Sequence, residues 1–203
     1  MDNRCDDPVR AAHLRETRPS PWITRFAPLV RPGGTVLDLA CGGARHGRYF
    51  LDRGHPVVLV DRDIDAASAL AGNTVEVIAA DLEDGSPWPF AGRTFAAVVV
   101  VNYLHRPLFP RLIEAVEAGG VLLYDTFARG NERFNRPRNP DHLLRAGELL
   151  EAVKDHLHVV AYEHGIVENA PIPGVKQRIC AVKAAPAPDR DDGEPDPVPL
   201  PAG

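Results

Sequence analysis

The sequence predicts a doubly wound α/β domain, in which a mostly parallel seven-stranded sheet ends in an antiparallel C-terminal hairpin at its edge. Two observations lead to this prediction. Short apolar runs rich in β-branched residues alternate with stretches of helical character, and each run is continuous rather than alternating in polarity. Continuous apolar strands are typical of parallel sheets buried on both faces, and their alternation with helices indicates βαβ crossovers.

The predicted elements follow one another at short intervals. Five strands are expected at residues 35–40, 56–60, 75–79, 95–101 and 121–124. Helices are expected between them at 46–52, 65–70 and 108–118, and a fourth at 146–155. The last two strands, near 157–163 and 176–183, are joined by a link that contains Gly and Pro, so we expect them to pair as the edge hairpin.

These elements fit one domain, residues 20–183, within a chain of 203 residues. Residues 1–19 are expected to form a flexible N-terminal segment, although Trp22, just beyond them, is expected to pack on the domain. Residues 184–203 contain six prolines and five acids. Such a segment buries too little apolar surface to offset its ordering entropy, so a disordered tail is expected.

Charge and composition argue against several classes of partner. The tail's five acids and one arginine sum to −4, so the net charge of −5 leaves only −1 on residues 1–183. A near-neutral domain has no field to hold nucleic acid. The chain has no secretory h-region, and its longest apolar run, 95–101, is too short to cross a membrane. Three cysteines without a CxxC, and no HExxH, argue against disulfides and metal and favour the cytoplasm.

The segment most informative about chemistry is Val36-Leu37-Asp38-Leu39-Ala40-Cys41-Gly42-Gly43-Ala44-Arg45-His46-Gly47. A buried strand carries an acid and runs into a loop of small residues, and a helix follows. Small residues let the backbone pass close to a ligand, and ligands of open α/β sheets bind at the carboxyl ends of strands.

Acids also end the next two strands. Asp61 is placed to accept hydrogen bonds from a ribose diol, Asp81 to meet an exocyclic amine, and Leu82 to pack on an adenine face. The structural alternative is that such acids only cap turns or helices.

The absence of two common nucleotide-binding motifs narrows the class of ligand that the loop is expected to bind. Neither the GxGxxG of dinucleotide folds nor the GxxxxGK[ST] of P-loops occurs, which argues against a nicotinamide-dependent oxidoreductase. A negative Asp38 would be unfavourable beside a pyrophosphate but acceptable beside the sulfonium and amine of S-adenosylmethionine.

On these residues the sequence resembles the Rossmann-like class I S-adenosylmethionine-dependent methyltransferases, and most closely the bacterial tellurite-resistance-type group. The resemblance covers residues 20–183 and includes 102–107 and 125–132 as loops on the substrate side. Ala40 and Ala44 depart from it, because glycine is usual at both positions. The motif and the resemblance together predict the following cofactor residues: Asp38, Ala40, Cys41, Gly42, Gly43, Asp61, Arg62, Asp81, Leu82 and Asn102.

The residues after the fourth predicted strand are candidates for the acceptor side. Asn102 and Tyr103 are expected to face the transferred methyl group, and His105 is the expected general base because its ordinary pKa of about 6.5 suits proton uptake near neutrality. Arg106 is expected to bind the acceptor. A solvated turn is the alternative for His105 and Arg106.

Residues 128–138 are predicted to form a lid over the site. They carry four arginines, and Arg129, Arg133 and Phe134 are the residues expected to bind the acceptor, with a polar exposed loop as the alternative. The predicted function is methyl transfer to a small molecule by in-line displacement, with S-adenosylhomocysteine as product. A protein that binds the cofactor without turnover is the alternative, motivated by the two alanines. The oligomeric state stays open.

Overall fold

A single seven-stranded sheet organises the protein. A computed structural model describes residues 16–168, 173–185 and 197–201. The strand order is β3-β2-β1-β4-β5-β7-β6. The strands are β1 (Val36–Leu39), β2 (Val57–Asp61), β3 (Val75–Ala79), β4 (Phe95–Val101), β5 (Val116–Phe127), β6 (His158–Val167) and β7 (Gly174–Val182).

The first five strands are parallel, and of the last two only β7 runs in the opposite sense. β7 runs antiparallel to β5, and β6 runs antiparallel to β7. The predicted doubly wound sheet and its antiparallel C-terminal hairpin are therefore confirmed. The link between the hairpin strands includes residues 169–172, which lie outside the described residues. Because β1 to β5 are parallel, the loops after them all emerge at one end of the sheet.

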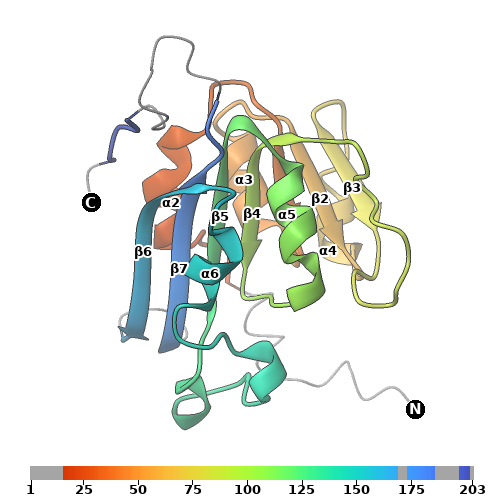
Figure 1. The fold of residues 1–203 in the computed structure, drawn as a ribbon. Coiled ribbons are helices and arrows are strands. Elements are labelled where there is room, and N and C mark those ends of the chain that lie inside the picture. The colour runs from red at the N-terminus through yellow and green to blue at the C-terminus, as the bar shows by residue number, and fades with distance from the viewer. Residues whose placement is uncertain (1–15, 169–172, 186–196, 202–203) are drawn as a thin grey trace.

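Helices cover both faces (Figure 1). One face carries α2 (Pro21–Phe26), the 3-10 turn η1 (Ala27–Leu29), α3 (Arg45–Leu51) and α4 (Asp65–Ser68). The other carries η2 (Arg106–Leu108), α5 (Phe109–Ala115) and α6 (Glu148–Val153). Each face has its own apolar core, with the continuous Val and Leu side chains of β1 and β4 divided between the two. Trp22 is 2% exposed and donates from Nε1 to the Ile179 carbonyl at 3.2 Å, so it packs on the domain as expected.

The predicted helix at 108–118 is wrong at its C-terminal end. The helix ends at Ala115, and residues 116–120 already belong to β5. The pairing of β5 with β4 is irregular here, because Phe95 pairs with Val116 and Ala97 with Val121. Gly120 makes the irregularity possible, since a Cβ at this position would lie 2.9 Å from the Phe95 carbonyl oxygen.

The long segment between β5 and α6 lies below the sheet in Figure 1, at the end of the sheet where β5 terminates. It contains two 3-10 turns, η3 (Asn131–Arg133) and η4 (Pro140–His142), and a bridge between Ala128 and Leu144 joins its two ends. Ala128 N donates to the Val175 carbonyl of β7 at 2.9 Å, which holds the segment to the sheet. The expected flexible segment 1–19 and disordered tail 184–203 stay predictions, because most of their residues lie outside the described ones. No helix among the described residues is long and apolar enough to span a bilayer.

Candidate functional site

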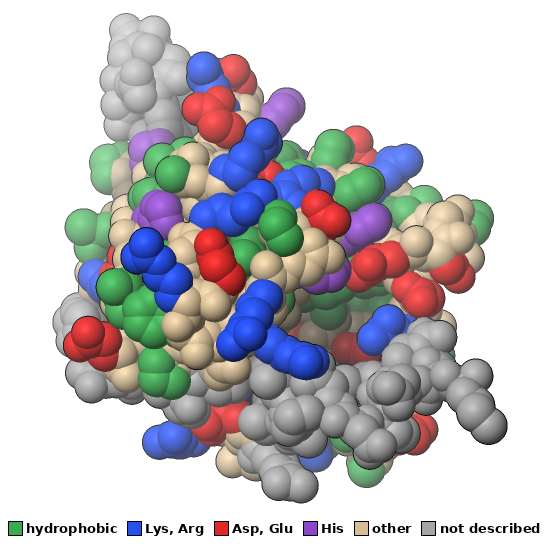
Figure 2. All heavy atoms as spheres, turned by 90° about the horizontal axis from the view of Figure 1, so that it is seen from below, with side chains coloured by type: hydrophobic (Ala, Val, Ile, Leu, Met, Phe, Trp, Pro, Cys, Tyr) green, Lys and Arg blue, Asp and Glu red, His purple; other side chains and the backbone are tan. Residues whose placement is uncertain are grey.

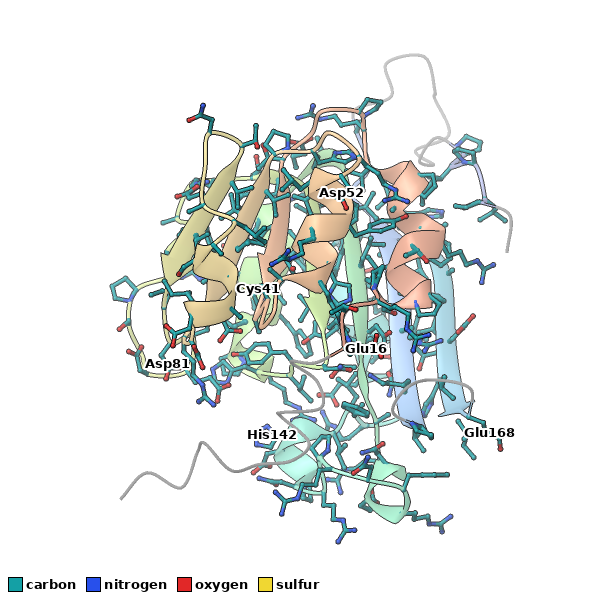
Figure 3. The ribbon with its side chains drawn as sticks, turned by 180° about the vertical axis from the view of Figure 1, so that it is seen from behind. Glu16, Cys41, Asp52, Asp81, His142 and Glu168 are labelled. Carbon is teal, nitrogen blue, oxygen red and sulfur yellow. The ribbon has the colours of Figure 1, made fainter. Side chains whose placement is uncertain are left out.

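A cavity of about 910 Å³ lies at the carboxyl end of the parallel strands. Figure 3 shows Glu16, Cys41, Asp81 and His142 along this end of the sheet, whereas Asp52 lies at the other end. Every predicted cofactor residue except Asp38 lines the cavity. Its volume is in the range typical of small-molecule and cofactor sites.

The loop after β1 forms one wall through an unusual backbone. Ala40, Gly42 and Ala44 all have positive φ, at 54°, 51° and 56°. The two alanines therefore adopt the left-handed conformation that glycine would adopt more easily. The loop is held to β2 because Gly42 N donates to Asp61 Oδ2 at 2.9 Å and Cys41 N donates to the Val60 carbonyl at 3.1 Å.

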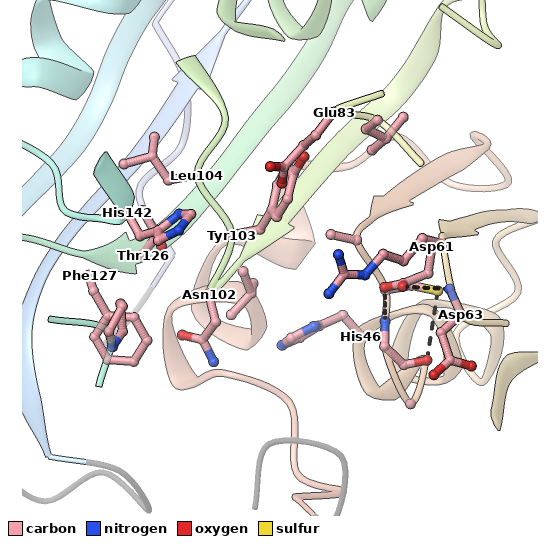
Figure 4. A pocket seen from close by; sticks show the side chains of 18 of the residues that line it. His46, Asp61, Asp63, Glu83, Asn102, Tyr103, Leu104, Thr126, Phe127 and His142 are labelled. Atoms are coloured by element: carbon pink, nitrogen blue, oxygen red, sulfur yellow. Dashed lines mark hydrogen bonds between the residues drawn. The ribbon is translucent and has the colours of Figure 1, made fainter. Parts of the chain in front are cut away.

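Asp61, at the end of β2 (Figure 4), and Asp81, just after β3, line the same cavity. Each also holds its own turn, since Asp61 Oδ1 accepts from Asp63 N at 3.1 Å and Asp81 Oδ1 accepts from Glu83 N at 3.0 Å. The structural role and the ligand role are compatible, because an ionised carboxylate accepts about four hydrogen bonds. Both carboxylates keep capacity for a ligand.

Asp38 occupies a different place from the one the sequence suggested. It is 1% exposed, does not line the cavity, and its Oδ2 accepts from Gly47 N of α3 at 2.8 Å. Gly47 allows this close packing, because a Cβ there would lie 2.4 Å from Leu59 Cδ2. Burial raises the pKa of the Asp38 carboxyl to about 7. Asp38 therefore fixes the helix that follows the loop, and a cofactor contact by Asp38 stays a prediction.

Asn102 and Tyr103 line the cavity at the end of β4, as the sequence predicted. Asn102 has a positive φ of 57°, and its backbone N donates to the Asp125 carbonyl at 2.9 Å. Its side-chain Oδ1 accepts a hydrogen bond from Lys176 Nζ. Burial, and then the Glu83 carboxylate, raise the pKa of the Tyr103 phenol, so it stays protonated.

His105 and Arg106 do not line the cavity. His105 Nδ1 lies 4.0 Å from Glu83 Oε2. The Arg106 guanidinium binds both carboxylate oxygens of Glu148, at 2.6 and 3.0 Å, and the carbonyls of Asp141 and Leu143. These bonds hold the segment before α6 against the start of η2, and the guanidinium is occupied by partners within the protein.

The arginine-rich segment contributes to the cavity through its second half. Arg136 and Arg138 line it, whereas Arg129, Arg133 and Phe134 do not. The arginines of this segment are exposed, and Figure 2 shows Lys and Arg side chains gathered on this end of the molecule.

Among the lining residues that sequence reasoning missed are His142, Glu16, Arg45 and His46. The last two open α3 directly after the loop, and that position was the available signal. His46 Nε2 accepts from Ser20 N at 3.2 Å, and burial lowers the pKa of its imidazole to about 3. His46 is therefore neutral at pH 7. No group of three or more His, Cys, Asp or Glu side chains in the described part of the chain is arranged to hold a metal ion.

Comparisons with known proteins bear on the fold. No protein-family model and no curated protein matches the chain. TehB from Haemophilus influenzae is similar in structure, with a TM-score of 0.63 at 18% identity over 79% of this chain and 61% of that one. A 1,6-didemethyltoxoflavin-N1-methyltransferase from Burkholderia thailandensis has a TM-score of 0.58 at 19% identity over 86% of this chain and 79% of that one. The [4+2]-cyclase SpnF has a TM-score of 0.61 at 14% identity over 92% of this chain and 85% of that one.

The chain therefore has the fold of class I S-adenosylmethionine-dependent methyltransferases. Within that class it is similar to TehB, of whose length it spans 61%. The similarity to SpnF shows that proteins of this fold also perform other chemistry.

Proposed function

We propose that the chain binds S-adenosylmethionine in this cavity and transfers its methyl group to a small-molecule acceptor by in-line displacement. One observation carries the proposal: Asp61 and Asp81, at the ends of adjacent strands, line one cavity together with residues 40–43 of the small-residue loop. Support also comes from the structure of the Burkholderia methyltransferase, which contains S-adenosylhomocysteine.

The residues present fit the cofactor. Asp61 is suited to accept from the ribose diol, and Asp81 to accept from the adenine amine. Leu82 is suited to pack on the adenine, and Arg62 lines the cavity directly after Asp61. The bound cofactor supplies an electrophilic methyl group on its sulfonium. Ala40, Cys41, Gly42 and Gly43 form a close wall without long side chains, which leaves room for the chain between ribose and amino acid.

We assign the rest of the cavity to the acceptor. Tyr103, Arg136, Arg138 and His142 line this part. Alignment and exclusion of water supply much of the acceleration of an in-line displacement, and a base is needed only for an acceptor that must lose a proton. The imidazole of His46, with a pKa of about 3, is too weak a base to take up a proton near pH 7. Because His105 lies outside the lining, we place the candidate base at His142.

We further propose a cytoplasmic protein without nucleic-acid or membrane partners, since residues 1–183 carry a net charge of only −1 and the cysteines form no CxxC.

Calorimetry with S-adenosylmethionine tests the cofactor site. The wild-type chain should bind one equivalent, and Asp61→Ala should weaken binding about 10- to 100-fold, because a hydrogen bond to a charged group contributes about 1.5–3 kcal/mol. Asp65→Ala, an exposed acid on the adjacent helix α4, is the matched control and should bind as wild type does. Absence of heat with the wild-type chain would overturn the proposal.

Turnover needs a second measurement, since a cofactor-binding protein without activity is the alternative. The protein is incubated with methyl-labelled cofactor and a panel of small-molecule nucleophiles, and transfer of label is followed by mass spectrometry. Labelled product supports the transferase. Binding without transfer to any member of a broad panel favours the inactive binding protein.

A further inference from the structure

A buried lysine that contacts two cavity-lining residues, Asn102 and Phe127, has no role in the function proposed so far. Lys176, on β7, has a side chain that is 8% exposed, and its Nζ lies 3.7 Å above the ring centre of Phe127. Burial lowers the pKa of its ammonium, whereas the nearby carboxylate of Asp125 raises it. A buried charge is costly to maintain unless its contacts offset the loss of hydration.

The contacts of Lys176 go beyond an ion pair. Its Nζ lies 3.4 Å from Asp125 Oδ1, but Asp125 also has Arg178 Nε at 3.4 Å and the Ser20 hydroxyl, which donates to Oδ2 at 2.7 Å. Asp125 is thus charge-paired without the lysine. The additional contact of Lys176 is the hydrogen bond that its Nζ donates to Asn102 Oδ1.

This hydrogen bond fixes the orientation of the Asn102 amide. An ammonium only donates, so the group that faces Lys176 must be the amide oxygen, and Nδ2 must point away from it. Figure 4 shows the Asn102 oxygen on the side of Phe127 and the nitrogen on the side of His46. Nδ2 has no hydrogen-bond partner among the described residues, and Asn102 lines the cavity. The cavity therefore receives a donor at the end of β4.

A donor in this position selects one end of an amino-acid group. If Asp61 holds the ribose, the amino-acid part of the cofactor extends past the loop 40–44 toward the end of β4, since β1 lies between β2 and β4 in the sheet. Arg45 also lines the cavity, and its charge acts on both Lys176 and Asp125, which places it nearby. An amide donor and a guanidinium suit a carboxylate, and the Lys176 charge disfavours an ammonium beside Asn102 Oδ1.

We propose that Lys176 is a positioning residue that locks the Asn102 amide with Nδ2 toward the cavity, where it donates to the amino-acid carboxylate of the cofactor. The proposal rests on the proposed function, because it requires the cofactor to bind in this cavity. The alternative is that Lys176 only stabilises the strand ends as part of the Asp125 ion-pair cluster.

Calorimetry with two ligands separates these roles. S-adenosylhomocysteine carries the amino-acid group, and 5′-methylthioadenosine has the same adenosine and thioether without it. Lys176→Met removes the donor and retains an unbranched chain. We expect it to weaken S-adenosylhomocysteine about 10-fold or more while 5′-methylthioadenosine changes less than about twofold. Arg178→Met, which removes the other cation from Asp125, should leave the affinity ratio of the two ligands unchanged.

Several outcomes would overturn the proposal. These are equal losses for both ligands in Lys176→Met, the same selective loss in Arg178→Met, or no loss at all. Asn102→Gly, which tolerates the positive φ, should show the same selective loss, and the double variant should lose little more than either single one. If Lys176→Met does not fold, Asn102→Gly decides: wild-type binding in that variant contradicts the proposal. A wild-type chain that binds neither ligand refutes the proposed function itself.

Discussion

Replacing Ala40 by glycine should stabilise the protein, although glycine is usually the more costly residue to order. Ala40 has a φ of 54°, and the left-handed conformation costs an L-residue about 1–2 kcal/mol. Glycine avoids this cost but loses about 0.4–1 kcal/mol through the greater freedom of the unfolded chain. The difference is a gain of about 0.5–1 kcal/mol in the free energy of unfolding, or about 2 °C in the melting temperature of a chain of this length.

Two further alanines provide matched controls. Ala44 has the same backbone strain, with a φ of 56°, but is 0% exposed, so Ala44→Gly also removes a buried methyl group that contributes about 0.8 kcal/mol. Its net effect should be close to zero. Ala66 is exposed in helix α4, and Ala66→Gly should destabilise by about 1 kcal/mol.

Urea unfolding of the three variants and the wild type measures these differences. The reasoning predicts the order Ala40→Gly above Ala44→Gly above Ala66→Gly in free energy of unfolding. A loss in Ala40→Gly as large as that in Ala66→Gly would refute it, because the loop would then hold Ala40 without strain.

Four other variants test the packing around the site. The folded-state pKa of Asp38, about 7, lies above its unfolded value, so the stability of the wild type falls as the pH rises from 5 to 8. The free energy of unfolding of Asp38→Asn, measured in urea, should therefore rise by about 2–3 kcal/mol relative to that of the wild type over this range. A difference that stays constant with pH would contradict this. Gly47→Ala should destabilise the protein by about 1–3 kcal/mol, because the added Cβ would collide with Leu59 of β2. Gly165→Ala is the control and should be nearly neutral, because no atom lies within 4 Å of its added Cβ. Equal effects of the two substitutions in thermal unfolding would contradict the packing argument. Arg106→Gln should lower the free energy of unfolding by about 2 kcal/mol, because Glu148 then keeps only its contacts with Arg145. Calorimetry at 10 °C should show cofactor affinity within about threefold of wild type, and lost affinity in a folded variant would contradict a purely structural role for Arg106.

The fold was predictable because its signals are local. The apolar run at 95–101 coincides with β4, since a strand buried on both faces has no alternating polarity to blur its ends. The run at 75–79 coincides with the edge strand β3, which is only partly buried. The start of β5 was not predictable in the same way. Its first residues continue a helical pattern, and only the pairing with β4 across an irregular step draws them into the sheet.

In the site too, residues placed by strand order were predictable, whereas residues placed by contacts between distant parts of the chain were not. Asp61 and Asp81 lie in the cavity because strand order alone brings their ends together. Asp38 and Arg106 instead face partners that strand order does not reveal. Gly47 lies nine residues after Asp38 on a helix packed against the strand, and Glu148 lies far along the chain from Arg106. The contact between Lys176 and Asn102 likewise depends on the antiparallel placement of β7 beside β5.

A crystal structure of the protein with S-adenosylhomocysteine tests the central claim most directly. The account predicts the ligand in the cavity at the carboxyl end of β1, β2 and β4, with its ribose hydroxyls within about 3.2 Å of the Asp61 carboxylate and its adenine against Leu82. A ligand bound elsewhere, or a cavity that stays empty at saturating ligand concentration, would contradict it.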